Sequence, residues 1–410
     1  MTLPIVIVGG GTAGSTVALH LAAATSRPII VCEPGDVSEW DDESHFFDVL
    51  KNSNLQRHES VTVVNRVVDY TQARAVGGGS AINGMLLSGQ QPPYVEGLTM
   101  IPHEDLMGDV SHALLASGGR PCRLWWNHGR WNPGRALVHL VEEGRVDWKK
   151  ELVTRMRHSN GVVNAVEIGT EIVDTDCVVL TAGAIGSPRL LLESGFDNYC
   201  SGIGVGVQDH PSINFSLRRR SANCGEFDAA VVKDLVGAEE SVGLMVVYER
   251  QNAANNSNAL ASVLLMNPDS RGVIAKTSDG IAVDSGLLAA LRDKRAMRDL
   301  VRQAVGVLFG APFDDVVDDV VGGVSGIPIG TMAKWDDQEL DEWILEEVAP
   351  VCHVSSSLST CVDETGRLRG VSGVVVADAS ILSAVPHETP AAAVTMEARR
   401  ISRLLGEALA

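Results

Sequence analysis

The sequence predicts an α/β (α+β) fold, in which a domain with a parallel sheet is assembled from separated segments and a second domain carries an antiparallel sheet. Three observations lead to this prediction. Short apolar runs, typical of strands that are buried on both faces, occur near both ends of the chain. The first run leads through a glycine cluster into a helix-forming segment. Between residues 214 and 332, segments with alternating apolar and polar residues, separated by polar turns, take the place of the continuous apolar runs, which indicates an inserted domain.

The composition excludes several classes of protein. The 410 residues allow two or three structural units, and 45% of them are hydrophobic. Asp and Glu number 52 against 33 Lys and Arg, a net charge of −19 that repels phosphate backbones and anionic lipids. We therefore expect no nucleic-acid partner, and the lack of an apolar run of about 18 residues predicts no integral membrane association.

The cysteines and the N-terminus bear on the cellular compartment. The seven cysteines are odd in number and scattered, without a CxxC pair, so we expect neither a disulfide scaffold nor a zinc ribbon. Only four residues precede the first apolar strand, which leaves no room for a secretory signal. These features predict a cytoplasmic protein.

The first elements form a strand–helix–strand unit of about 30 residues, the size of a βαβ crossover. Residues 5–8 and 28–32 are β-branched apolar runs, and the small residues of 12–24 predict the helix between them. Residues 36–58 are polar without a sustained period, so we expect a loop with short helical pieces. A glycine cluster then opens a small-residue segment at 77–84.

The glycines of the first turn predict dinucleotide binding in a Rossmann-like domain. Gly9, Gly11 and Gly14 form the pattern GxGxxG between the strand and the helix. The first glycine permits the tight turn, the second lets the backbone approach a pyrophosphate, and the third lets helix and strand pack closely. Glu33 ends the next strand, where its carboxylate can accept hydrogen bonds from ribose hydroxyls but would repel a 2′-phosphate. The fingerprint therefore favours FAD or NAD over NADP, without choosing between them.

The remaining elements follow in order. Short alternating segments at 137–142, 153–157 and 162–168 predict an antiparallel meander, and 177–180 is another buried strand. An arginine-rich helix is expected at 287–305 and an amphipathic helix at 336–348, before a strand and helix within 371–405. We therefore assign residues 1–100, 135–213 and 350–410 to the nucleotide-binding domain and residues 101–134 and 214–349 to a substrate or cap domain.

Four further segments resemble the glucose–methanol–choline (GMC) flavoprotein oxidoreductases, in the order in which that family has them. Residues 74–85 resemble its first signature, a glycine and serine loop that ends in asparagine, and residues 181–191 are similar to its second. Residues 204–211 resemble its GxNLxDHP segment, with Gly206 in place of Asn. Residues 373–380 resemble its flavin-contacting strand. The chain is identified on these segments as a short member of the family.

The resemblance implies FAD as the cofactor. Some members carry a histidine that is bonded covalently to the flavin at the position of Ile82, so we expect FAD to be held non-covalently here. The resemblance also implies that Val153 contacts the adenine through its backbone and that Asp378 lies near the flavin. With the fingerprint, the expected cofactor-binding residues are Gly9, Gly11, Thr12, Ala13, Gly14, Glu33, Arg74, Gly78, Gly79, Ser80, Asn83, Val153, Ala182, Asp378 and Ala379.

The resemblance further implies a histidine base. The family places it after the amphipathic helix in a His-x-x-Gly-Thr segment, which makes His353 the candidate, although Ser356 and Ser357 replace Gly-Thr here. Histidine suits the role because its pKa lies near neutrality. An ungapped alignment of the last helix places Thr389 at the position of a second catalytic group. His387 lies two residues earlier, and we favour it because an imidazole can share proton transfer.

The expected activity is FAD-dependent oxidation of an alcohol (CH–OH) to the carbonyl, with the hydride passing to flavin N5. Family members commonly exceed 410 residues, and shortening between residues 83 and 135 and in the second domain predicts an open site. One alternative is a dehydrogenase that re-oxidises a reduced redox carrier, as the mycofactocin-associated member does, and passes electrons to a partner. Another is a flavin-binding protein with a decayed site. No residue selects the electron acceptor.

Overall fold

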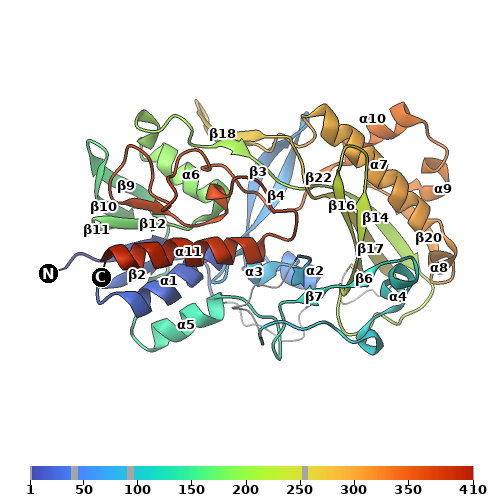
Figure 1. The fold of residues 1–410 in the computed structure, drawn as a ribbon, viewed down its shortest axis with the longest axis horizontal. Helices are drawn as coiled ribbons and strands as arrows, with labels where there is room; N and C mark the ends of the chain where they lie inside the picture. The colour runs from blue at the N-terminus through green and yellow to red at the C-terminus, as the bar shows by residue number, and fades with distance from the viewer. Residues whose placement is uncertain (1, 38–44, 90–96, 252–256, 410) are drawn as a thin grey trace.

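The computed structural model describes residues 2–37, 45–89, 97–251 and 257–409 (Figure 1). Its nucleotide-binding part is built on a parallel sheet of five strands in the order β23-β12-β1-β2-β8. The β-branched runs predicted as strands form its centre, because their side chains are buried on both faces. The five strands are β1 (Ile5–Val8), β2 (Ile29–Cys32), β8 (Asp147–Lys149), β12 (Cys177–Leu180) and β23 (Val374–Val376).

Segments from both ends of the chain complete this domain, as the sequence predicted. The helices α1 (Thr12–Ala24) and α11 (Ala391–Leu409) pack side by side along the sheet (Figure 1). Their approach is close, since a Cβ atom added to Gly406 would lie 2.8 Å from the Cβ of Ala24.

The predicted meander is correct for two of its three segments. The strands β9 (Val153–Ser159) and β10 (Val162–Ile168) pair antiparallel, and β11 (Glu171–Asp174) extends the sheet. Residues 137–142, however, belong to a helix, α5 (Gly134–Glu142), that packs against α1. The reason is their period: Leu137 and Leu140 are three residues apart and share the buried face, which is helical rather than strand spacing.

A second sheet crosses the domain boundary drawn from the sequence. Its order is β13-β18-β19-β3-β4, so that strands from residues 56–73 pair with strands from residues 272–284. The segment 36–58, expected to be a loop with helical pieces, holds one helix and the start of β3 among its described residues. The strands are β3 (Gln56–Val63), β4 (Arg66–Ala73), β13 (Val205–Val207), β18 (Gly272–Thr277) and β19 (Gly280–Asp284).

The inserted region forms a larger, antiparallel sheet with helices packed on it (Figure 1). The two predicted helices are present as α7 (Leu291–Leu308) and α10 (Asp337–Glu347), the latter beginning with a capping box between Asp336 and Glu339. The strands are β6 (Arg120–Pro121), β14 (Pro211–Arg219), β15 (Val231–Val236), β16 (Val242–Tyr248), β17 (Asn258–Leu265), β20 (Val317–Gly322), β21 (Ile327–Pro328) and β22 (Ala349–Pro350).

Shorter elements connect these layers. They are α2 (Phe46–Lys51), α3 (Gly79–Ile82), β5 (Leu86–Leu87), η2 (Glu104–Leu106), α4 (Asp109–Ala116), β7 (Arg123–Leu124), α6 (Gly183–Glu193), η3 (Phe196–Asn198), α8 (Ala311–Asp314), α9 (Ile329–Met332) and η4 (Ala379–Ile381). Among the described residues, no helix combines the length and the apolar character that a membrane crossing needs.

Candidate cofactor cradle and active site

The first glycine turn has the geometry that its sequence pattern predicts. Gly9 adopts φ +102°, a conformation that favours glycine, and an added Cβ would lie 2.6 Å from the carbonyl oxygen of Thr181. A Cβ on Gly14 would lie 1.8 Å from the carbonyl oxygen of Gly9. The first and third glycines are therefore required by the close packing of β1, α1 and the end of β12.

The second glycine meets the other glycine-rich loop. A Cβ on Gly11 would lie 3.5 Å from the Cα of Gly78, which itself adopts φ +55°. The Thr12 hydroxyl joins the two loops because its oxygen lies 3.2 Å from the Gly77 carbonyl oxygen and 2.9 Å from Ser80 Oγ. Segments that are about 65 residues apart in sequence thus form one backbone surface, to which Ala13 contributes as a buried residue of α1.

Two glycines of the cradle, Gly79 and Gly183, have open space at the position that a Cβ atom would occupy. A Cβ on Gly79, the first residue of α3, or on Gly183, the first residue of α6, would meet no atom within 4 Å. Bare backbone beside free volume is what a bound pyrophosphate and ring system require. The residues present therefore fit a dinucleotide with respect to space.

Glu33 lies at the end of β2 and is 8% exposed. Its two carboxylate oxygens accept backbone hydrogen bonds, Oε2 from Gly10 at 3.0 Å and Oε1 from Gly35 at 2.8 Å. Burial raises the pKa of Glu33, while these two bonds and the nearby charges of Arg57 and Arg74 act against that rise. The carboxylate is held rigidly beside the first turn and keeps lone pairs for ribose hydroxyls.

Asp378 links the two strand ends at the other side of the cradle. Its Oδ2 accepts hydrogen bonds from the Gly183 backbone at 2.9 Å and from Ser187 Oγ at 2.6 Å. Its Oδ1 accepts from the backbone of Ser380 at 2.9 Å and from Ser380 Oγ at 2.5 Å. Burial raises the pKa of this carboxyl, and the four hydrogen bonds to it oppose the rise. The neighbours Ala182, the residue before α6, and Ala379 are positioned by this link.

Val153 and Asn83 lie in less distinctive surroundings. Val153 is the buried first residue of β9 and pairs with Ile168, as a strand residue without a ligand would also do. The side-chain oxygen of Asn83 accepts a hydrogen bond from the backbone of Met85 at 3.0 Å, so that it shapes its own turn.

Two residues that the sequence analysis left out of the site lie against this cradle. Arg130 is 2% exposed and donates from Nη2 to the carbonyl oxygen of Asn83, while its Nε and Nη1 have no partner among the described residues. Asn132 accepts a hydrogen bond from the backbone of Gly134 at 2.8 Å, and its Nδ2 is likewise unpaired within the described chain. A Cβ on Gly77 would lie 2.2 Å from Asn132 Oδ1.

These unpaired donors fit a ligand rich in acceptors. Burial lowers the pKa of Arg130 to about 10, which leaves the guanidinium charged at neutral pH. Buried donors without acceptors are costly, and phosphate oxygens of a bound FAD would satisfy them. The sequence analysis assigned residues 101–134 to the substrate or cap domain, and no motif marks them. Their one signal is the turn-forming segment that ends with Asn132, Pro133 and Gly134.

His353 lies in the loop after β22, bound to a second histidine. Its Nδ1 is 2.9 Å from Nδ1 of His210, a fully buried residue at the start of β14. Burial lowers the pKa of His353 well below 6.5 and that of His210 to about 4, so both rings are neutral at pH 7. Asp209 accepts backbone hydrogen bonds from both histidines, at 2.8 Å from His210 and 3.0 Å from His353.

The departures from the family pattern have structural readings. Ser356, where the family has glycine, is buried and adopts φ +71°, a left-handed conformation that glycine takes most readily. Its backbone N–H donates to the Ala379 carbonyl at 3.0 Å, and the Leu358 N–H donates to the Ser380 carbonyl at 2.8 Å. The loop of His353 is therefore attached to the segment that follows Asp378.

Neither candidate for the second catalytic group contacts His353 through a described hydrogen bond. His387 is exposed, next to Pro386, whose carbonyl accepts from His210. The Thr389 hydroxyl donates to the Leu86 carbonyl at 2.7 Å and accepts from the Ser88 backbone at 3.2 Å. That hydroxyl attaches the loop to β5, and the side chain that contacts His353 is that of His210.

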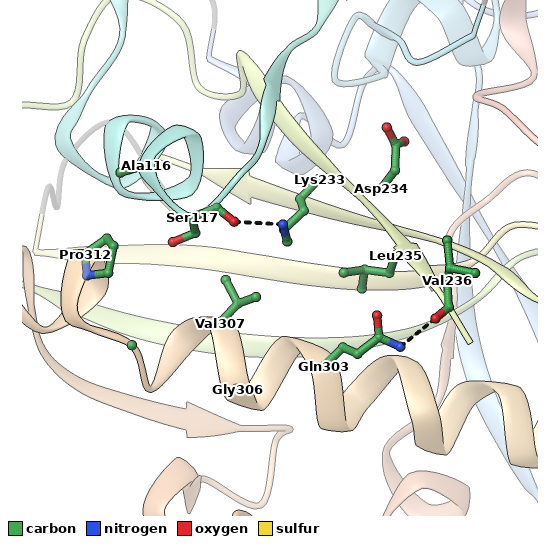
Figure 2. A pocket seen from close by; sticks show the side chains of 11 residues that line it. Ala116, Ser117, Lys233, Asp234, Leu235, Val236, Gln303, Gly306, Val307 and Pro312 are labelled. Atoms are coloured by element: carbon green, nitrogen blue, oxygen red, sulfur yellow. Dashed lines mark hydrogen bonds between the residues drawn. The ribbon is translucent and has the colours of Figure 1, made fainter. Parts of the chain in front are cut away.

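A separate hollow of about 690 Å³ lies between α4, β15 and α7 (Figure 2). None of the predicted site residues lines it. Its polar groups are already paired, since Lys233 donates to the Ser117 carbonyl at 2.7 Å and Gln303 to the Val236 carbonyl at 3.0 Å, as Figure 2 shows. The hollow is therefore not the candidate site. Nor do the described residues contain a group of three His, Cys, Asp or Glu arranged to hold a metal ion.

Comparison with known proteins places this arrangement among flavoenzymes. The family model described as GMC oxidoreductase matches residues 268–398. A 5-(hydroxymethyl)furfural oxidase of Methylovorus sp. (strain MP688) is 23% identical over 93% of this chain and 94% of its own. An oxygen-dependent choline dehydrogenase of Vibrio vulnificus (strain YJ016) is 24% identical over 56% of this chain and 50% of its own.

Solved structures share the fold over the whole chain. Pyridoxine 4-oxidase from Mesorbium loti has a TM-score of 0.81 at 18% identity, covering 98% of this chain and 99% of its own. A formate oxidase variant from Aspergillus oryzae RIB40, studied for FAD modification, has a TM-score of 0.83 at 15% identity over 99% of this chain and 98% of its own. The resemblance drawn from the sequence is thereby confirmed: the chain matches the GMC oxidoreductase family model over residues 268–398 and is similar to FAD-dependent oxidoreductases of that family.

Proposed function

We propose that this protein oxidises a small-molecule alcohol to the corresponding carbonyl compound, with His353 as the base. The observation that carries the proposal is the attachment of the His353 loop to the cofactor cradle. Ser356 and Leu358 donate backbone hydrogen bonds to Ala379 and Ser380, directly after Asp378, which in turn accepts from Gly183. A base on this loop is held at the end of the cradle where the resemblance places the flavin.

The residues divide the work between binding and proton transfer. Gly9, Gly11, Gly14 and Glu33 would hold the ADP half, while the loop 78–83 and Asp378 would hold the flavin half. When bound, FAD supplies the two-electron acceptor for the carbon-bound hydrogen, which leaves as hydride. His353 accepts the hydroxyl proton, because its neutral imidazole is a base at pH 7.

The relatives' names suggest the first compounds to test. 5-(Hydroxymethyl)furfural, choline and pyridoxine carry an alcohol group, and formate is the further donor named among the similar structures. The FAD-loaded protein should be mixed anaerobically with each compound while its flavin absorbance is recorded. Bleaching by one compound identifies a donor, and the rate of recolouring in air then shows whether oxygen is an efficient acceptor.

Two variants test the base. His353→Gln should keep its FAD and lose flavin reduction by about 10²–10⁴-fold, the usual contribution of a general base. His139→Gln is the matched comparison, because His139 is an exposed residue of α5 and is not one of the predicted site residues. Reduction of the His353→Gln protein at the wild-type rate would overturn the assignment. A wild-type protein that no donor bleaches would contradict alcohol oxidation on these compounds.

A further inference from the structure

Two histidine side chains that are 143 positions apart in sequence meet nitrogen to nitrogen in the candidate active site. The Nδ1 atoms of His210 and His353 are 2.9 Å apart, and the two rings are nearly perpendicular, at 89°. His210 has no exposed surface, whereas His353 is half-buried. A contact at this distance is a hydrogen bond, so one nitrogen donates and the other accepts.

The other side of His210 decides which nitrogen donates. Its Nε2 lies 2.9 Å from the carbonyl oxygen of Pro386. A carbonyl oxygen only accepts, so the contact with Pro386 favours the tautomer of His210 that carries its proton on Nε2 and leaves Nδ1 of the neutral ring as an acceptor. The backbone of Met266 also interacts with the His210 ring. His353 must then donate from Nδ1, and its Nε2 is left without a proton. With the opposite tautomer of His353, two lone pairs would face each other at 2.9 Å, and Nε2 would already carry a proton.

The backbone around the pair is held independently of the His210 ring. Asp209 Oδ1 accepts from the backbone N–H groups of both histidines, and its Oδ2 accepts from the Tyr70 hydroxyl at 3.0 Å. Replacing the imidazole of His210 therefore leaves the clamp on the two backbones in place. The side chain of His210 can be tested apart from the fold of the loop.

We propose that His210 is a positioning residue that holds His353 in the Nδ1–H tautomer, so that Nε2 of His353 is the atom that accepts the substrate hydroxyl proton. This inference rests on the proposed function for its catalytic part. In the reaction the substrate O–H bond breaks and the Nε2–H bond forms on His353, while the carbon-bound hydrogen leaves as hydride to FAD. The Nδ1–H of His353 keeps donating to His210 throughout.

The tautomers can be observed without any substrate. In FAD-loaded protein labelled with ¹⁵N-histidine, long-range ¹H–¹⁵N correlation should show one ring protonated at Nδ1, which is absent from His353→Gln. Two replacements then separate hydrogen bonding from bulk. Asn in His210→Asn keeps an acceptor near the former Nδ1, so His353 should stay protonated at Nδ1. The leucine side chain in His210→Leu offers no acceptor, so His353 should no longer be protonated at Nδ1 alone. The FAD content of each variant verifies folding.

Kinetics test the catalytic part with the donor that bleaches the wild-type flavin. His210→Leu should lower the rate constant of flavin reduction about 100-fold with little change in the donor concentration at half-saturation, and His210→Asn should recover most of the loss. An Nε2-protonated His353 in the wild type, or a His210→Leu protein that reduces at the wild-type rate, overturns the proposal. If the predicted tautomers are observed but no donor bleaches the flavin, the proposed function is contradicted, whereas the assignment of the histidine pair is not.

Discussion

Two glycine-to-alanine substitutions separate what holds the fold from what holds the cofactor. A Cβ at position 14 would lie 1.8 Å from the Gly9 carbonyl oxygen and 2.8 Å from Thr181 Oγ1. Since the first of these neighbours is backbone, α1 must move away from β1 by more than an ångström. Overpacking of this kind costs roughly 1–3 kcal/mol and sometimes more, so we expect Gly14→Ala to lose about 3 kcal/mol of unfolding free energy.

Gly79→Ala is the contrasting change. Its added Cβ meets no atom within 4 Å, and alanine favours the helix that begins there, so the apoprotein should keep its stability. The methyl group would, however, occupy the open volume that we assign to FAD. We expect the dissociation constant of FAD to rise at least 10-fold, which corresponds to about 1.4 kcal/mol.

Urea unfolding of the apoproteins and FAD titration followed by flavin fluorescence measure the two effects. Gly14→Ala should unfold at a clearly lower urea concentration, and Gly79→Ala should match the wild type. Native FAD affinity in Gly79→Ala would refute the position of the cradle, because a ligand there has no room for the methyl group. An unchanged urea midpoint in Gly14→Ala would refute the packing argument.

Three further predictions concern the same regions. Because Ile82 cannot bond to the flavin, acid precipitation should leave FAD in the supernatant, and a flavin-coloured pellet would contradict non-covalent binding. Arg130→Met should raise the FAD dissociation constant about 10-fold or more by removing unpaired donors, whereas Arg155→Met, at an exposed strand position, should not. Burial lowers the pKa of His210 to about 4, against 6.5 unfolded, so its stabilising effect is complete above pH 6.5 and is lost as the pH falls toward 4. The unfolding free energy lost through His210 between pH 6.5 and pH 4 is about 3 kcal/mol. Burial raises the pKa of Asp209 to about 7, so the protonation of this carboxyl increases stability as the pH falls through the same range. The difference in urea stability between wild type and His210→Leu, measured at pH 4 and 7, reports the titration of His210 together with its effect on His353, and a constant difference would refute the prediction.

The local patterns of the chain determined much of the nucleotide-binding domain. The β-branched runs became the centre of the parallel sheet, since residues buried on both faces need no alternation. Gly9 and Gly14 occupy the close contacts that their spacing predicts. The run from Asp336 became a capped helix, because its cap and its apolar period are both local signals.

Tertiary structure decided what depends on contacts between distant segments. The pairing of residues 56–73 with residues 272–284 leaves no local mark in either segment. Arg130 is brought against Asn83 by a segment without a motif. The His210–His353 contact spans 143 positions, and the proton on His210 is assigned by the carbonyl of Pro386. The sequence alone thus determined the candidate base, His353. Which of its two ring nitrogens carries the proton depends on hydrogen bonds between segments that come together only in the folded chain.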